Sequence, residues 1–128
     1  MPKNEVKHPD KSGYTGAYSA GVACDGWLFV SGQIPMDFKT GGLLDGDVAE
    51  QTRKTLENVE KVLQAAGCSR ADVIRCGCFL ADIGDFKAFD AVYAEFFGEG
   101  VRPARTTTQA GLLPGVKVEI DAIARIPG

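Results

Sequence analysis

Pro103-Ala104-Arg105, followed by Leu113-Pro114-Gly115-Val116-Lys117-Val118-Glu119-Ile120, is the stretch that decides how the end of this chain folds. It predicts two strands, over residues 105–110 and 116–125. We expect them to be the arms of a hairpin, with Arg105 and Glu119 facing one pocket. An arginine beside a glutamate can hold an acidic substrate and present a water molecule to it. Taken alone, the two side chains are more typical of a plain cross-strand ion pair.

The final strand carries two different faces. Alternate residues place apolar side chains on one side, namely Val116, Val118, Ile120, Ala122 and Ala124. The other side carries Lys117, Glu119, Asp121, Ile123 and Arg125. Because successive side chains of a strand point to opposite faces of its sheet, the second set does not suit a core under helices. It predicts a face in contact with solvent or with another subunit.

Two helices are predicted upstream of these strands. For residues 47–66, Asp47 and Glu50 form a capping-box start and Gly67 suits the C′ position. The apolar stripe of this helix is Val48, Thr52, Leu56, Val59, Leu63 and Ala66. A second helix over residues 85–97 carries an aromatic row of Phe86, Phe89, Tyr93 and Phe96. Such a row is more typical of a core than of a ligand site.

Three further strands complete the pattern. Residues 18–23 and 27–33 flank Asp25-Gly26, which favours a type I′ hairpin turn, and residues 73–80 form a largely apolar run. The order ββαβαββ predicts an α+β fold in which two amphipathic helices cover one face of a mixed sheet. The opposite face then needs a partner, since the following side chains cannot all be buried otherwise: Phe29, Cys76, Cys78 and Ile123.

Length and composition are those of one globular domain. The chain has 128 residues, of which 45% are hydrophobic and 24% charged. We expect a single domain over residues 1–128, with a flexible N-terminal segment over residues 1–15. No apolar run approaches the ~20 residues that span a bilayer, and the N-terminus resembles neither a secretory signal nor a transit peptide. A cytoplasmic protein without membrane contact is the expectation.

Charge and potential metal ligands exclude other classes. A net charge of −3 and scattered basic residues argue against binding of nucleic acid, which requires a basic surface. The single histidine, His8, lies in the N-terminal segment. The cysteines lack zinc-ligand spacing; they are Cys24, Cys68, Cys76 and Cys78. We expect reduced thiols and no metal.

Short motifs occur in a fixed order along the chain. They are Ser31-Gly32-Gln33-Ile34-Pro35, Glu50-Gln51-Thr52, Leu56-Glu57-Asn58, Ala65-Ala66-Gly67, Asp85-Phe86, Tyr93-Ala94-Glu95-Phe96-Phe97, Pro103-Ala104-Arg105 and Val118-Glu119-Ile120. With these motifs in this order, residues 16–124 closely resemble the Rid family (reactive intermediate deaminases, YjgF-type). The resemblance implies a chorismate-mutase-like fold and a homotrimer with three sites in the clefts between subunits.

The same resemblance implies an enzyme. Rid proteins hydrolyse enamines and imines released by pyridoxal-phosphate enzymes, such as 2-aminoacrylate and 2-aminocrotonate, to 2-oxo acids and ammonia. The implied activity is that of a 2-iminobutanoate/2-iminopropanoate deaminase. The reaction needs a carboxylate anchor, a positioned water and help for proton movement, but neither a metal nor a cofactor.

The matched motifs imply the site residues. Arg105 matches the arginine that binds the substrate carboxylate, and Glu119 matches the glutamate that holds and activates the water. Tyr18 matches a pocket tyrosine, and Ser31 with Gly32 matches a Ser-Gly pair on the second strand. Ordinary edge packing of Tyr18 and a β-bulge at Gly32 are the alternatives. Further pocket-lining positions are Ile34, Phe89, Asp90 and Thr107.

Three positions depart from the commonest family pattern. Asp90 stands where many members have asparagine, Thr107 where many have cysteine, and Ala17 where proline usually precedes the tyrosine. If Asp90 faces the pocket, its carboxylate would repel an anionic substrate. The substrate preference is therefore less determined than the type of reaction.

Two other functions are compatible with a chain of this kind. One is an RNA-cleaving inhibitor of translation, against which the acidic charge balance argues. The other is a non-catalytic trimer that binds metabolites or acts as a holdase. The presence of both Arg105 and Glu119 argues against it, since a binding module needs the cation but not a water-holding acid.

Overall fold

The computed structural model describes residues 2–128. The strands are β1 (Asn4–Val6), β2 (Gly21–Cys24), β3 (Trp27–Gln33), β4 (Met36–Asp37), β5 (Gly42–Leu43), β6 (Val73–Leu80), β7 (Ala104–Gln109) and β8 (Val118–Arg125). The helices are α1 (Val48–Ala65) and α2 (Phe86–Phe97), with short 3₁₀ helices η1 (Arg70–Asp72) and η2 (Ile83–Asp85). Neither α-helix of the described chain has the length and apolar character needed to cross a membrane.

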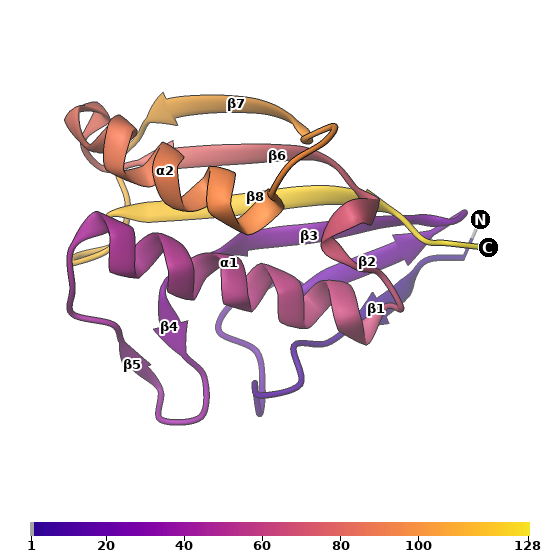
Figure 1. The fold of residues 1–128 in the computed structure, drawn as a ribbon. Coiled ribbons are helices and arrows are strands. Elements are labelled where there is room, and N and C mark those ends of the chain that lie inside the picture. Colours follow the sequence, from indigo (N-terminus) through magenta and orange to yellow (C-terminus); the bar gives the residue numbers. More distant parts are fainter. Residues whose placement is uncertain (1) are drawn as a thin grey trace.

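A six-stranded mixed sheet forms one layer, and α1 and α2 lie together on one of its faces (Figure 1). The strand order is β1-β2-β3-β8-β6-β7, and β4 with β5 forms a separate small hairpin. Neighbouring strands of the sheet are antiparallel except β6 and β7. That pair is parallel because α2 carries the chain back across the sheet between them. The predicted α+β fold, with two helices on one face of a mixed sheet, is confirmed.

The predicted hairpin of the last two strands is wrong. β6 lies between β7 and β8, in parallel with the former and antiparallel to the latter. The burial of the strands explains this order. β8 is buried at every second residue and is placed in the middle of the sheet, whereas the polar β7 has no fully buried residue and forms an edge.

The local signals for α1 and for the first hairpin are confirmed. Asp47 Oδ1 accepts a hydrogen bond from the amide of Glu50 at 2.8 Å, and Glu50 Oε1 accepts one from the amide of Asp47 at 3.1 Å. Gly67, just beyond the helix, has a φ of 78°. In the turn between β2 and β3, Asp25 and Gly26 have φ values of 54° and 80°, as a type I′ turn requires. Contacts within a few residues therefore fix both elements.

The core lies between the helices and the sheet. Its central side chains come from α1 and β8, and include Leu56, Val59, Leu63, Val118 and Ile120, all fully buried. On the face without helices, Phe29 is 47% exposed and Ile123 is only partly buried. The sequence predicted Cys76 and Cys78 on that open face, and this prediction is wrong. Both side chains are fully buried in the core. The register of β6 explains the difference, because it pairs them with core-facing residues of β8.

The N-terminal segment is more ordered than the sequence predicts. β1 pairs with β2, and His8 is buried with its Nε2 atom 3.0 Å from Asn58 Oδ1. Asn58 in turn donates through Nδ2 to the backbone carbonyl oxygens of Ile34, just after β3, and Met36, the first residue of β4. The expectation of a flexible segment over residues 1–15 therefore does not hold for residues 4–8. Backbone pairing ties them to the sheet, and a buried side chain ties them to α1.

Candidate functional site

A groove lies on the sheet face that the helices leave open. Five of the predicted site residues line it, Tyr18, Ser31, Gly32, Ile34 and Glu119. They come from β3, from β8, from the loop that precedes β2 and from the residue that follows β3. Phe29, Arg75, Leu113 and Asp121 lie beside them. We call the five predicted residues the groove cluster.

Glu119 is the central acid of the groove. It lies on β8 against Gly32 of β3, where an added Cβ atom would collide with Glu119 Oε2 and come within 3.0 Å of its Cδ. Glycine at this position leaves room for the carboxylate against the backbone. Burial, and then the neighbouring Asp121, raise the pKa of Glu119. A carboxylate with a raised pKa is a stronger base, as general-base catalysis near neutral pH requires.

Ser31 and Gly32 form a β-bulge. The pairing of β3 with β8 shifts between Val30 and Gln33, so that these two residues lie opposite a single residue of β8. The β-bulge that the sequence left as an alternative for Gly32 is therefore present, and the role of Gly32 in lining a substrate pocket stays a prediction. The Ser31 hydroxyl donates to the carbonyl oxygen of Ser19 at 2.6 Å. Its oxygen can therefore only accept a hydrogen bond from a molecule in the groove.

Asp121 and Gly77 were not among the predicted site residues. Asp121 Oδ1 accepts a hydrogen bond from the amide of Gly77 at 2.8 Å, and a Cβ atom at Gly77 would lie 2.6 Å from that oxygen. Glycines on both strands next to β8 thus make room for its two carboxylates. The alternation of β8 places Asp121 beside Glu119 and could have identified it. Gly77 becomes recognisable only when β6 is known to neighbour β8.

Tyr18 lies at the rim of the groove and is 46% exposed. Its hydroxyl oxygen is 2.7 Å from Thr15 Oγ1, and the Lys11 ammonium group is 4.9 Å from the centre of its ring. The loop between β1 and β2 therefore holds the ring, while one side of the ring lines the groove.

Arg105 does not reach this groove in its own chain. It lies opposite Cys76 of β6, on the side that the helices cover, whereas Glu119 points to the open side. Among the described residues its carboxylate partner is Asp90 on α2, with Arg105 Nη1 2.7 Å from Asp90 Oδ1. Within one chain, the expected shared pocket and the alternative ion pair of Arg105 with Glu119 are both wrong, because β6 separates the two strands.

Aromatic side chains of α2 surround the guanidinium group of Arg105. Its central carbon lies 4.7 Å from the ring centre of Tyr93, 5.4 Å from that of Phe86 and 5.5 Å from that of Phe89. Phe89 is fully buried. Thr107, two residues along β7 on the same side, has a buried Oγ1 atom without a hydrogen-bond partner in residues 2–128. The remaining predicted site residues thus form an arginine cluster of Phe89, Asp90, Arg105 and Thr107.

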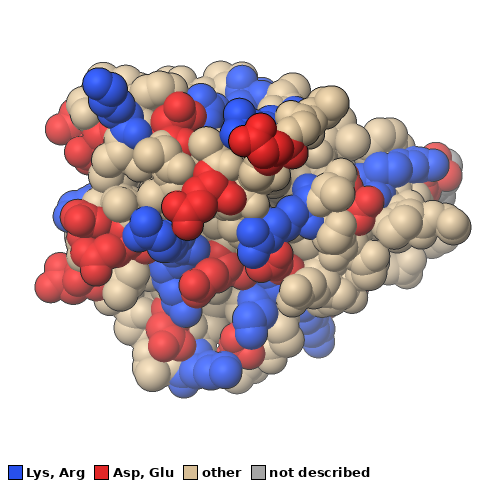
Figure 2. Space-filling view, in the orientation of Figure 1, with Lys and Arg blue, Asp and Glu red and all other residues tan. Residues whose placement is uncertain are grey.

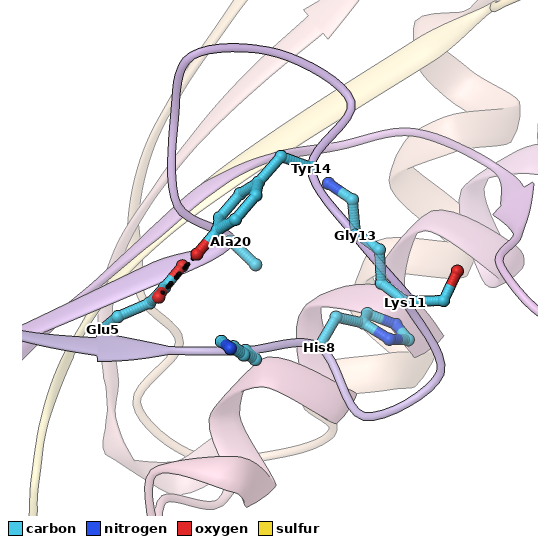
Figure 3. Close-up of a pocket in the computed structure, with 8 residues that line it drawn as sticks. Glu5, His8, Lys11, Gly13, Tyr14 and Ala20 are labelled. Carbon is cyan, nitrogen blue, oxygen red and sulfur yellow. Dashed lines mark hydrogen bonds between the residues drawn. The ribbon is translucent and has the colours of Figure 1, made fainter.

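A second hollow lies between β1 and the loop that follows it (Figure 3). The Tyr14 hydroxyl points at Glu5 and donates a 2.9 Å hydrogen bond to its Oε1 atom, with His8 and Lys11 across the hollow. This hydrogen bond raises the pKa of Tyr14. The hollow contains none of the predicted site residues. Across residues 2–128, moreover, no three side chains of His, Cys, Asp or Glu come together as a metal site would require.

Comparisons with known proteins agree with this architecture. Residues 10–126 match the family model described as endoribonuclease L-PSP. A RutC family protein of Pyrococcus horikoshii is 46% identical over 110 residues, which cover 85% of this chain and 86% of the relative. The 2-iminobutanoate/2-iminopropanoate deaminase of Rattus norvegicus is 44% identical over 110 residues, covering 85% of this chain and 80% of the relative. The crystal structure of E. coli TdcF with bound serine is 38% identical, with a TM-score of 0.87, and the match covers 95% of this chain and 98% of that one.

Proposed function

Because the chain belongs to the endoribonuclease L-PSP family, which is the YjgF/Rid family, we propose that it hydrolyses 2-imino acids and their enamine tautomers to 2-oxo acids and ammonia. Relatives named 2-iminobutanoate/2-iminopropanoate deaminase, 40% to 44% identical to this chain, support that reaction. The observation that carries the proposal is the Glu119 carboxylate, partly buried against Gly32 and with a raised pKa. The substrates would be the small, unstable products of pyridoxal-phosphate enzymes.

The proposed reaction gives Glu119 the part of a general base. The enamine first gains a proton at C3 while its nitrogen loses one, which gives the 2-imino acid. Water then adds to C2: a C–O bond forms, Glu119 takes a proton from the water, and the imine nitrogen takes up a proton. The carbinolamine collapses when its hydroxyl loses a proton and the C–N bond breaks, with a proton returned to the departing nitrogen. One water is consumed and one ammonia released, without an oxidant or reductant.

Arg105 is proposed to hold the substrate carboxylate. Asp90 engages one N–H group, on Nη1, and among the described residues the other guanidinium N–H groups have no hydrogen-bond partner. Two of these can pair with a carboxylate in the fork geometry that guanidinium groups favour. The aromatic rings of α2 fix the plane of the group in advance, which lowers the entropy lost on binding.

A complete site requires two copies of the chain under this proposal. The groove cluster and the arginine cluster lie on opposite faces of one sheet, so Arg105 of one copy must face the groove of another. The open face supports such contact, since Tyr18, Phe29 and Leu113 are 46%, 47% and 65% exposed. We propose a homotrimer of this kind. Sedimentation equilibrium should give three times the chain mass of 13.6 kDa, and a monomer at micromolar concentration would contradict the proposal.

The charge distribution favours a small-molecule substrate over RNA. On the face shown in Figure 2, basic and acidic side chains alternate over α1 and around it. The chain as a whole carries a net charge of −3. A protein that tracks a nucleic-acid backbone needs a continuous basic groove, which this face does not present.

A coupled assay tests the proposed function. A serine or threonine dehydratase generates the enamine, and loss of the imine is followed with and without the purified chain. We expect the chain to accelerate the loss. Glu119→Gln should lower turnover by about 10²–10⁴-fold while the product analogue 2-oxobutanoate still binds. Arg105→Ala should lose both, with kcat/KM lower by ~30-fold to several thousand-fold, because a charge-assisted anchor is removed.

Control variants keep the assay interpretable. Glu99→Gln removes an exposed acid beyond the end of α2 and should leave turnover unchanged. Arg105→Lys should stay impaired, since an ammonium group cannot reproduce the planar fork. Normal turnover by Glu119→Gln would refute the assigned base. No acceleration by the unmodified chain would refute the reaction itself.

A further inference from the structure

Asp90 already binds one N–H group of Arg105, the residue that we propose binds the substrate carboxylate. Its Oδ1 atom accepts the 2.7 Å hydrogen bond from Arg105 Nη1. The side chain of Asp90 is 45% exposed and that of Arg105 is 22% exposed, so a dissolved anion can reach the pair. In the described part of the chain, Arg105 is the only basic side chain within ion-pair distance of Asp90.

We propose that Asp90 is a specificity-determining residue, an internal carboxylate that shares Arg105 with the substrate and limits the negative charge that the site accepts. The inference rests on the proposed function, which assigns Arg105 to the substrate carboxylate. It predicts a site for small imino acids that carry one carboxylate and a neutral or cationic side chain. Dicarboxylic imino acids are disfavoured.

The substrate must share Arg105 rather than displace Asp90 from it. The rings of Phe86, Phe89 and Tyr93 hold the guanidinium group on the α2 side, next to Asp90. Asp90 uses one N–H group, so further donors remain for a ligand. Two carboxylates on one guanidinium repel each other, and this repulsion lowers the affinity for the second.

The sum of the charges gives the selectivity. Arg105 and Asp90 together are neutral, so a bound monocarboxylate leaves one net negative charge and a dicarboxylate leaves two. Asp90 repels the second carboxylate of a dicarboxylate most strongly where the two groups lie within about 8 Å, the screening length at physiological ionic strength.

Calorimetric titration of the full chain with 2-oxobutanoate and with 2-oxoglutarate tests the proposal. Asp90→Asn keeps an oxygen acceptor for Arg105 but removes the charge. It should tighten binding of 2-oxobutanoate by about 3–10-fold and of 2-oxoglutarate by about 10–100-fold. Glu95→Gln is the matched control, because it removes one charge from an exposed position of the same helix. It should change neither affinity by more than about twofold.

Kinetics separate a charge effect from a structural one. In the coupled assay, Asp90→Asn should lower KM for the imine and leave kcat within about twofold, since the carboxylate contact is made equally in the ground state and the transition state. Asp90→Ala removes the acceptor that orients Arg105 as well as the charge, so it should gain less than Asp90→Asn. A gain by alanine as large as by asparagine would overturn the view that Asp90 also orients Arg105.

The outcomes distinguish this inference from the proposed function. One outcome overturns only the role of Asp90. In it, the unmodified chain turns over imines, but Asp90→Asn has the same KM for the imine and the same affinities for the 2-oxo acids as Glu95→Gln. An equal gain for the two 2-oxo acids overturns the selectivity. If 2-oxobutanoate binds in a way that depends on Arg105 but imines are not turned over, only the proposed reaction is refuted. The role of Asp90 then still requires that Asp90→Asn tightens the binding of 2-oxobutanoate. If neither the unmodified chain nor Asp90→Asn binds 2-oxobutanoate or 2-oxoglutarate, both proposals fail.

Discussion

Replacing Gly32 with alanine tests the position of Glu119 without changing a charged group. The backbone of Gly32 is outside the left-handed region, so alanine can adopt it. The added Cβ atom would collide with Glu119 Oε2 and lie 3.0 Å from its Cδ and 3.2 Å from its Cγ. The Glu119 side chain is only partly buried and can rotate away. The free energy of unfolding should therefore change by about 1 kcal/mol or less.

The activity should respond far more than the stability. An ordinary contact is restored only if the carboxylate moves by about 1 Å, and a misplacement of that size can lower a rate by about 10²-fold. We expect kcat/KM in the coupled assay to fall by about 10²-fold, while 2-oxobutanoate still binds. Gly13→Ala is the matched control, because no atom lies within 4 Å of its added Cβ. This variant should have the activity of the unmodified chain.

A double variant shows whether Gly32 acts through Glu119. If it does, adding Gly32→Ala to Glu119→Gln should lower turnover by less than about threefold, because the displaced group is no longer a base. Full activity of Gly32→Ala would refute the argument that the placement of Glu119 controls turnover. Independent, multiplicative losses would show that Gly32 acts by another route, such as the bulge itself.

Three further predictions concern stability and reactivity. His8→Ala leaves Asn58 Oδ1 without this partner and should lower the free energy of unfolding by about 1–3 kcal/mol in urea, and an unchanged midpoint would contradict this. Burial lowers the pKa of His8 below 6.5. The contribution of neutral His8 to the free energy of unfolding is therefore present above that pH and is lost as the pH falls through the folded-state pKa. This pH-dependent loss of stability should be absent in His8→Ala. The pKa of Glu119 is raised above 4.5, so its contribution is present below that pH and is lost as the pH rises through the folded-state pKa. Glu119→Gln should then be at least as stable as the unmodified chain at neutral pH, and a less stable variant in urea would refute this sign. Burial raises the pKa of Cys68, and that of Cys76 to about 11, and Cys78 is buried as well. Mass spectrometry after alkylation of the native protein should find only the partly exposed Cys24 modified, and labelling of a second thiol would contradict the burial.

The elements whose causes are local could be predicted from the amino-acid sequence alone. The capping box of Asp47 with Glu50 and the turn at Asp25-Gly26 depend on atoms a few residues apart, so they could be predicted without any tertiary contact. The alternation along β8 separated its core side from its largely polar side for the same reason. The ordered motifs of the family added a list of candidate site residues, but no arrangement of them in space.

Which of those residues share a face of the sheet depends on contacts between elements that are distant in the chain. The order of the strands depends on how apolar side chains from distant parts of the chain are buried together. The alternation along β7 and β8 does not specify that β6 lies between them. That position of β6 separates Arg105 from Glu119 and brings Gly77 to Asp121. The contact of Arg105 with Asp90 likewise joins an edge strand to a helix. Such contacts depend on how the whole chain packs, because side chains on different elements meet only after the elements have docked.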